Sequence, residues 1–172
     1  HGLTQAAFKN IGSLVQTNAE KYKNKPFLGT RKVVSRETKD KIQITHYEPA
    51  ITWQTYGEVL KRMQNIGAGL VKVTGLNSGD RFAIIDNSSQ DWFMTAQALL
   101  QYNITLVTVY ATLGEEATIQ ALNETEVTAV LTSDDQVKKF ERIAKEVPTL
   151  KQIVVRSDMR ASDAPPKSLN NN

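Results

Sequence analysis

The sequence predicts an α/β protein with an open, largely parallel sheet that carries helices on both faces, preceded by an N-terminal helix and a small β-hairpin. Two observations predict this fold class. From Arg81 onward, short apolar segments alternate with amphipathic ones, the pattern of parallel strands joined by helical crossovers. The short segments are also almost continuously apolar, as in 83–85 and 129–131, which is typical of strands covered by helices on both sides.

The N-terminal third of the chain is predicted to form a helix followed by three β-rich stretches. Apolar residues recur at spacings of three and four over residues 4–22, which predicts an amphipathic helix. Two β-rich stretches follow at 27–35 and 42–47, and the polar segment 36–41 between them is predicted to be the solvated turn of a hairpin. A further short strand is predicted at 51–53.

Helix starts are marked by pairs of residues with the spacing of a capping box. Thr55 and Glu58 have this spacing before a long amphipathic segment that Gly75 is placed to end. Ser133 and Gln136 have it as well. The alternation then predicts strands at 82–85, 105–109, 128–131 and 152–155, and helices at 89–101, 113–124 and 134–147. Gly67 and Gly69 fall inside the first long helix, so they are assigned to helix packing.

The regular pattern stops near the C-terminal end of the sequence. Residues 157–172 contain Pro165 and Pro166 and end in three asparagines, a composition that cannot bury itself. We therefore expect one α/β subdomain over residues 1–156 and a flexible tail or linker over residues 157–172.

Composition excludes several classes of function. The 172 residues include no cysteine and two histidines, so thiolate chemistry is excluded and no metal site is predicted. Neither a G-x-x-x-x-G-K-[ST] phosphate loop nor a G-x-S-x-G nucleophile motif is present. The 21 basic and 18 acidic residues are scattered, which does not indicate nucleic-acid binding. The lack of cysteine favours an intracellular location, and no apolar run reaches the roughly 18 residues of a membrane span.

Candidate site residues follow two of the predicted strands. Ligands of open α/β sheets bind beyond the carboxyl ends of the strands, so the substrate-proximal candidates are Asn87 after one strand and Tyr110, Thr112 and Glu115 after the next. Thr112 and Glu115 also have capping-box spacing, so a purely structural role competes. Trp92 on the intervening helix is suited to line an apolar pocket, but a helix that covers a sheet needs such residues anyway, so core packing is the preferred assignment. No catalytic residue is predicted.

Four segments carry longer motifs in a fixed order. They are ITWQTYGEV at 51–59, GDRFAI at 79–84, NSSQDW at 87–92 and TVYATLGEEA at 108–117. They resemble, in turn, the ITY-x-E, G-D-R/K-V-A-I, N-S/C-x-E/D-W and V-x-x-Y-D-T-L-G motifs of long-chain fatty acyl-CoA synthetases, members of the adenylate-forming superfamily. Ala111 stands where many members carry Asp, so no ligand role is inferred for that position.

The resemblance implies an N-terminal fragment of a ligase that uses ATP, Mg²⁺ and coenzyme A. Such an enzyme converts a long-chain fatty acid and ATP to an acyl-adenylate and pyrophosphate, and coenzyme A then displaces AMP. The family's Ser/Thr/Gly-rich phosphate loop and C-terminal catalytic lysine have no counterpart between His1 and Asn172, so we expect the fragment to be inactive alone and to bind none of these cofactors.

The implied partners are the remainder of the polypeptide and the fatty acid, and self-association stays open. The implied location is cytoplasmic or peripheral on an organelle membrane. Two alternatives of other classes also stay open. A free-standing nucleotide-binding module would need the missing glycine fingerprint, and a noncatalytic interaction domain would expose an apolar patch.

Overall fold

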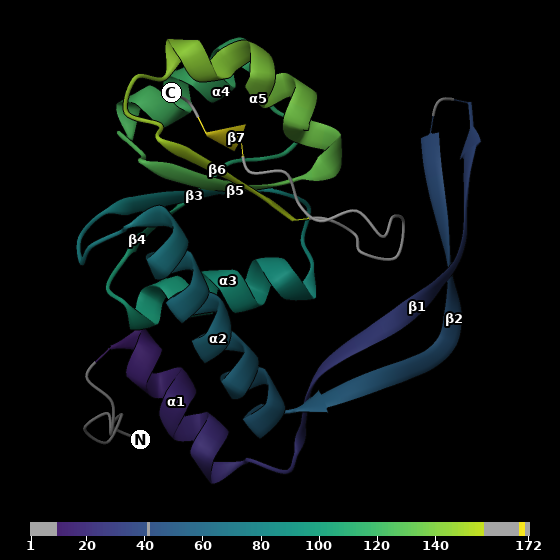
Figure 1. Cartoon of the computed structure of the whole chain (residues 1–172). Coiled ribbons are helices and arrows are strands. Elements are labelled where there is room, and N and C mark those ends of the chain that lie inside the picture. Colours follow the sequence, from purple (N-terminus) through teal and green to yellow (C-terminus); the bar gives the residue numbers. More distant parts are fainter. Residues whose placement is uncertain (1–9, 41, 157–168, 171–172) are drawn as a thin grey trace, which may run out of the picture. The chain divides into compact units, whose positions relative to one another are not determined.

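The computed structural model describes residues 10–40, 42–156 and 169–170 and divides the chain into two compact units, His1–Gln64 and Asn65–Asn172. The first unit contains α1 (Ile11–Lys21), β1 (Pro26–Lys39), β2 (Ile42–Thr55) and the first turns of α2 (Tyr56–Thr74) (Figure 1). After the end of α2, the second unit contains β3 (Arg81–Ile85), α3 (Gln90–Gln101), β4 (Thr105–Thr108), α4 (Glu115–Glu124), β5 (Ala129–Ser133), α5 (Val137–Ile143), β6 (Gln152–Arg156) and β7 (Leu169–Asn170).

Helix α1 begins with a capping box that the sequence analysis missed. The backbone N–H of Ser13 donates to the Asn10 side chain at 2.9 Å, and the N–H of Asn10 donates to the Ser13 hydroxyl at 3.1 Å. Both contacts satisfy backbone donors that the first turn of a helix leaves without partners. The helix therefore begins at Ile11, later than predicted, and the first nine residues lie outside the described part of the chain.

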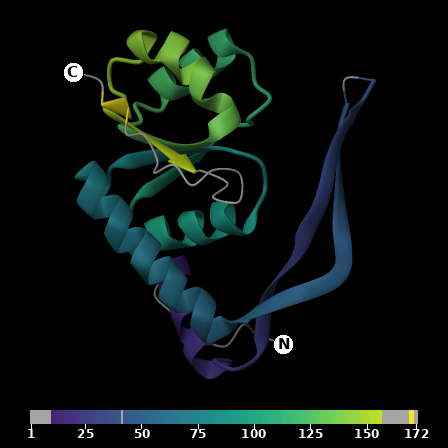
Figure 2. The same cartoon turned by 45° about the vertical axis from the view of Figure 1, so that its right-hand side comes forward.

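Strands β1 and β2 form a long antiparallel ribbon (Figure 2). The predicted turn over 36–41 is wrong, because pairing continues to Lys39 and Ile42 and the chain reverses at Asp40, whose φ is 50°. The predicted strand at 51–53 is part of β2. Arg31 pairs with Ile51 and Val33 pairs with Tyr47, so one residue of β1 lies opposite the three residues 48–50 of β2. Pro49, which has no N–H to donate, lies in this irregular stretch.

The predicted capping box of α2 is confirmed. The carboxylate of Glu58 accepts from the backbone N–H of Thr55 at 2.7 Å and from its hydroxyl at 2.9 Å, and the N–H of Glu58 donates to the Thr55 hydroxyl at 3.3 Å. Helix α2 ends at Thr74, and Gly75 follows with a φ of 68°, as expected of a glycine that terminates a helix.

The second unit contains a sheet with the strand order β4-β3-β5-β6-β7. The first four strands are parallel, as predicted, and each lies within two residues of its predicted bounds. The short β7 pairs antiparallel with β6 and falls within the segment predicted as a tail. The rest of that segment lies outside the described residues.

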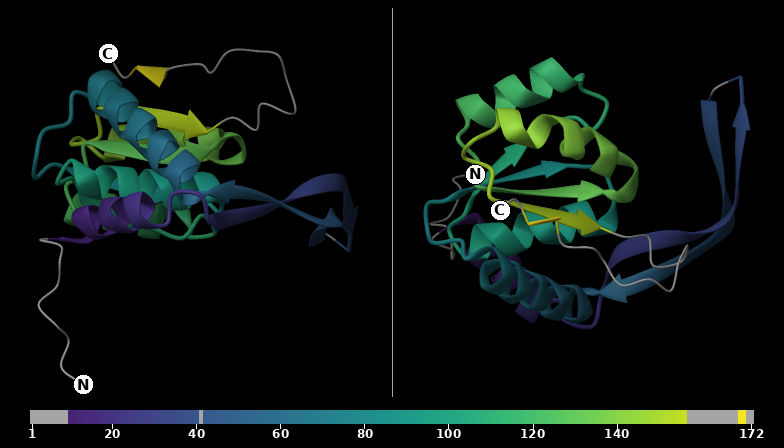
Figure 3. Two further views of the ribbon diagram at one scale, coloured as in Figure 1. Left: turned by 90° about the horizontal axis from the view of Figure 1, so that it is seen from below. Right: turned by 45° about the horizontal axis from the view of Figure 1, so that its top comes forward.

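Two apolar clusters cover the two faces of this sheet, as the alternation of side chains along each strand requires. Ala83, Ile85 and Val130 pack with residues of α4 and α5, whereas Phe82, Ile84 and Leu131 pack with residues of α3 and the end of α2. Figures 1 and 3 show α4 and α5 together on one side of the strands. The predicted sheet with helices on both faces is thus confirmed.

The helix predicted over 134–147 is interrupted. Val137–Ile143 is α-helical, and it is flanked by the 3₁₀ turns Asp134–Gln136 and Ala144–Glu146. The predicted capping box is wrong: no side-chain cap bond is present at Ser133, and the amide of Gln136 donates to Asp135 at 3.0 Å instead.

Candidate functional site

The carboxyl ends of β3 and β4 meet at one edge of the sheet and leave a cavity of about 230 Å³ there. We call it the edge cavity. Its lining comprises Asp86, Ser88, Trp92, Thr108, Val109 and Tyr110. This is the place where ligands bind in open parallel sheets, because the loops that follow the strands diverge there.

Trp92 is held in the wall of the edge cavity by the start of α3. The hydroxyl of Ser89 caps this helix by accepting from the backbone N–H of Trp92 at 3.1 Å. The indole is partly buried and packs against the cluster that includes Phe82 and Leu99. Trp92 therefore contributes to the core, as predicted, and it also lines the cavity.

Asp86 supplies a buried carboxylate beside the cavity, and its charge is already paired. Its side chain is fully buried, and its oxygens accept from Nε and Nη2 of Arg156 at 2.6 and 3.2 Å and from the N–H of Asn87 at 2.7 Å. A buried carboxylate requires such partners. Asp86 is therefore suited to shape the wall rather than to attract a cation.

The wall formed by Tyr110 belongs to a turn between β4 and α4. The N–H of Val109 donates to the Ile84 carbonyl at 3.2 Å, and the N–H of Leu113 closes the turn on the Tyr110 carbonyl at 3.1 Å. Tyr110 itself is 82% exposed. Its position is consequently determined by the backbone on either side of it.

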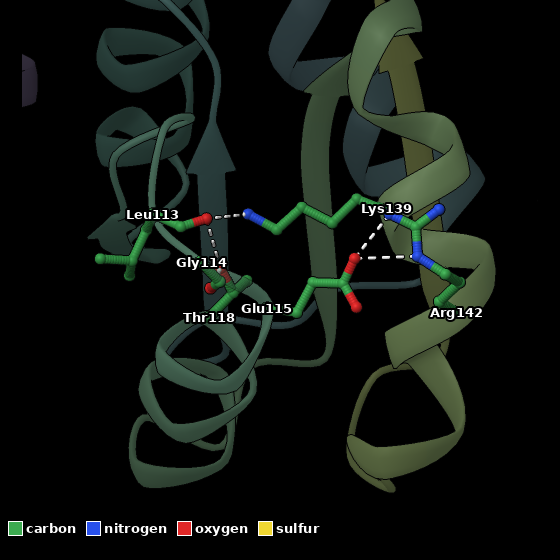
Figure 4. A network of polar contacts seen from close by, with 6 residues as sticks. All are labelled: Leu113, Gly114, Glu115, Thr118, Lys139 and Arg142. Carbon is green, nitrogen blue, oxygen red and sulfur yellow. Dashed lines mark hydrogen bonds and ion pairs between the residues drawn. The ribbon is translucent and has the colours of Figure 1, made fainter.

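Two residues of α5 hold the start of α4 (Figure 4). The Lys139 ammonium donates to the Leu113 carbonyl at 2.6 Å, and Nε and Nη2 of Arg142 donate to one oxygen of Glu115 at 2.8 and 2.5 Å. The hydrogen bond from Arg142 lowers the pKa of Glu115, and the same contact raises the pKa of Arg142. Burial lowers the pKa of Lys139, opposed by the nearby charge of Glu115.

These contacts correct the predicted capping role of Thr112 and Glu115. Gly114 is the residue before the first turn of α4, and no side-chain cap bond is present there. Glu115 is the first helical residue and is bound to Arg142, a partner 27 positions away. Its charge still lies in the first turn, where the helix dipole favours an acid.

The four predicted site residues lie in three different environments. Tyr110 lines the edge cavity. Asn87 is exposed and lies between two lining residues, and Thr112 is exposed in the turn that follows Tyr110. Glu115 takes part in the ion pair with Arg142. Thr108, Val109 and Lys139 were not predicted as site residues, because Thr108 and Val109 fall within a predicted strand and a lysine beside the apolar stripe of a helix is normally solvated.

A metal site would require several carboxylates or imidazoles that converge. Over residues 10–40, 42–156 and 169–170, no group of three or more such side chains comes together. In the same part of the chain, none of the helices combines the length and hydrophobicity needed to cross a bilayer.

Comparison with known proteins agrees with this architecture. The chain is 37% identical over 150 residues to Long chain acyl-CoA synthetase 8 of Arabidopsis thaliana, a match that covers 83% of this chain and 20% of that protein. It is 36% identical over 96 residues to Long-chain-fatty-acid–CoA ligase 1 of Schizosaccharomyces pombe, covering 56% of this chain and 14% of that protein. The chain thus spans a fifth or less of the length of these relatives.

Solved structures with the same fold include the A domain of carboxylic acid reductase from Segniliparus rugosus in complex with AMP and a co-purified carboxylic acid. It aligns with a TM-score of 0.74 at 17% identity, over 88% of this chain and 24% of that one. The fatty acyl CoA synthetase of Mycobacterium tuberculosis aligns with a TM-score of 0.64 at 15% identity, over 86% and 26%. The family model described as AMP-binding enzyme matches residues 19–171, and the chain therefore belongs to the family of AMP-binding enzymes.

Proposed function

We propose that this chain is the N-terminal part of an ATP-dependent long-chain fatty acid–CoA ligase. The observation that carries the proposal is the 37% identity over 150 residues to a long-chain acyl-CoA synthetase, which covers most of this chain. The whole enzyme would convert fatty acid, ATP and coenzyme A to acyl-CoA, AMP and pyrophosphate. The remainder of the polypeptide is the first partner of this chain, and the long-chain fatty acid is the substrate.

In this proposal the chain supplies scaffold and substrate contacts rather than catalytic groups. The described residues offer no cluster that fits Mg²⁺, and the sequence has no phosphate loop, so the metal, ATP and coenzyme A are assigned to the rest of the enzyme. We propose that residues 1–156 are the N-terminal subdomain of the AMP-binding region, with 157–172 as a tail or linker. The location that we propose is cytoplasmic or peripheral on an organelle membrane, with self-association open to measurement.

The edge cavity is proposed to contact the acyl chain. Trp92 and Val109 give it apolar walls, and burying each methylene of a fatty acid is favourable by about 0.8 kcal/mol. Ser88, Thr108 and Tyr110 place hydroxyl groups around the same space. A ligand with an apolar body and a polar end matches this lining.

Palmitate titration of the 172-residue chain tests the cavity. The chain contains two tryptophans, Trp53 and Trp92, so a Trp53→Phe background leaves Trp92 as the only indole. We expect a saturable change in its fluorescence, with weaker binding after Tyr110→Ala and unchanged binding after Tyr47→Ala, which removes an exposed tyrosine from β2. A response that does not saturate, or equal loss in both variants, would remove the cavity from the proposal.

The parent transcript tests the enzymatic proposal. We expect the sequence after the Asn172 codon to encode the phosphate loop and the C-terminal lysine, and the 172-residue chain alone to release no pyrophosphate from ATP and palmitate. A stop codon directly after Asn172, or palmitate-dependent pyrophosphate release by the chain alone, would contradict it.

A noncatalytic interaction domain is the second candidate, and the β1/β2 ribbon favours it. Tyr47, Ile51 and Trp53 are 54%, 44% and 55% exposed on β2. Large exposed apolar side chains of this kind mark interaction surfaces. Size-exclusion chromatography of the chain with and without Trp53→Ser separates the candidates. An interaction domain would lose self-association in the variant, while its binding of palmitate stays unchanged.

A further inference from the structure

A buried lysine joins α5 to the loop that forms one wall of the edge cavity. Lys139 is only 9% exposed, and its ammonium donates to the Leu113 carbonyl at 2.6 Å across 26 residues of sequence. A charged donor gives a stronger hydrogen bond than a neutral one. Figure 4 shows its side chain running from α5 to the end of the loop, with Glu115 beside it.

The contact acts on a short stretch of backbone. The Leu113 carbonyl receives Lys139, while the Leu113 N–H donates to Tyr110 at 3.1 Å. The next carbonyl, that of Gly114, accepts from the Thr118 hydroxyl at 2.7 Å. Any displacement of Leu113 is therefore transmitted to Tyr110 through a single turn of backbone.

The neighbouring ion pair cannot replace this contact. The side chains of Arg142 and Glu115 are 59% and 44% exposed, so salt screens their attraction. Lys139 is shielded from solvent by comparison, and its hydrogen bond to an uncharged carbonyl does not depend on a charged partner. Tyr110 adds no packing of its own, since most of its side chain is exposed.

We propose that Lys139 is a positioning residue for the cavity, which holds loop 110–114 through the Leu113 carbonyl and so fixes Tyr110 against the bound ligand. The position of the loop follows from these hydrogen bonds alone, whereas the identity of the ligand rests on the proposed function. Lys139 touches no ligand in this proposal.

Hydrogen exchange of the 172-residue chain tests the loop. Replacing the ammonium in Lys139→Met should accelerate exchange of the Leu113 amide about tenfold, the effect of losing roughly one hydrogen bond, without changing exchange in β3 and β5. Lys138→Met is the matched control, because Lys138 is exposed on the same helix. Lys139→Arg should restore most of the protection, since it returns a charged donor. Lys139→Leu provides a second variant in case Lys139→Met does not fold, with the same acceleration expected because leucine has no donor.

Palmitate affinity, followed by Trp92 fluorescence in the Trp53→Phe background, is the second readout. We expect about tenfold weaker binding in Lys139→Met and unchanged binding in Lys138→Met. Equal exchange at Leu113 in the Lys139 and Lys138 variants would overturn the inference, and so would acceleration spread over the whole sheet. If the parental chain does not bind palmitate, the acyl contact of the proposed function fails, while the exchange comparison still decides the role of Lys139.

Discussion

Arg156 at the end of β6 and Asp86 after the end of β3 form a two-bond ion pair, although β5 lies between their strands. The pair joins residues 70 positions apart at the edge of the sheet that carries the cavity. Asp86 is completely buried, whereas the Arg156 side chain is 26% exposed. The two partners therefore differ in what their removal would cost.

Replacing Arg156 should destabilise the second unit strongly. In Arg156→Met the buried carboxylate of Asp86 loses its guanidinium, and we expect the free energy of unfolding to fall by about 3 kcal/mol. Urea denaturation measures the change. Arg81→Gln is the control, because the Arg81–Glu126 pair is exposed at the surface and should contribute less than about 1 kcal/mol. Equal losses in the two variants would contradict a special role for the buried pair.

The free energy of unfolding should depend on pH through Glu58 in the first turn of α2. Hydrogen bonds from the backbone N–H and hydroxyl of Thr55 lower the pKa of Glu58 below its ordinary value of 4.5. The unfolded chain thus takes up this proton at higher pH than the folded chain does. The stabilisation is complete above about pH 5 and is lost as pH falls through the lowered pKa.

Thermal unfolding at several pH values tests this. Glu58→Gln should lower the melting temperature at pH 7, and the difference from the parental chain should shrink as pH falls through the lowered pKa of Glu58, because the carboxyl then becomes neutral in the folded chain as well. Glu124→Gln serves as the control, because Glu124 is an exposed acid at the C-terminal end of α4, where the dipole disfavours it. If Glu58→Gln lowered the melting temperature by the same amount at every pH, the stabilisation would not come from the charge of Glu58.

Replacement by alanine should change the stability of the chain differently at two glycines of α2. A Cβ at Gly67 would lie 2.6 Å from the ring of Tyr102, whereas nothing lies within 4 Å of a Cβ at Gly69. Gly69→Ala should therefore stabilise the chain by up to about 1 kcal/mol through helix propensity. Gly67→Ala should be less stable than Gly69→Ala by at least about 1 kcal/mol, because Tyr102 must move. Equal melting temperatures would show that the ring yields freely.

The parallel sheet could be predicted because its signals are local. Strand and helix periods are written in short windows of sequence, and the buried strands of the second unit are apolar on both faces. The length of the ribbon could not be predicted in the same way. Residues 36–39 are polar and exposed, so no apolar alternation marks them as part of β1. These residues are paired with β2 because they continue the ladder of hydrogen bonds that residues 26–35 already form with it.

Capping boxes illustrate the same limit at single residues. Thr55 and Glu58 form the predicted box because both partners lie within one turn. Glu115 has the same spacing from Thr112, yet it binds Arg142, which the fold brings close from another helix. Spacing along the chain carries no information about such a competitor.

The site was predictable to the level of the sheet edge. The rule for parallel sheets led to Tyr110, which lines the cavity, and to the neighbourhood of Asp86 and Ser88. It could not separate the core role of Trp92 from its cavity role, because one side chain serves both. Lys139 gave no signal, since a lysine beside the apolar stripe of a helix is normally solvated.

The strand order also has a consequence for synthesis on the ribosome. β3 is the first strand of the sheet to be made, but its neighbours β4 and β5 and the helices that cover its two faces all follow it, except for α2. From Ile85 to Val147, the last residue of the α5 segment in the core, the ribosome must add about 60 residues, which takes roughly 3–12 s at 5–20 residues per second. Until then one face of this apolar strand lacks part of its native cover, so β3 is a natural binding segment for chaperones that act on nascent chains.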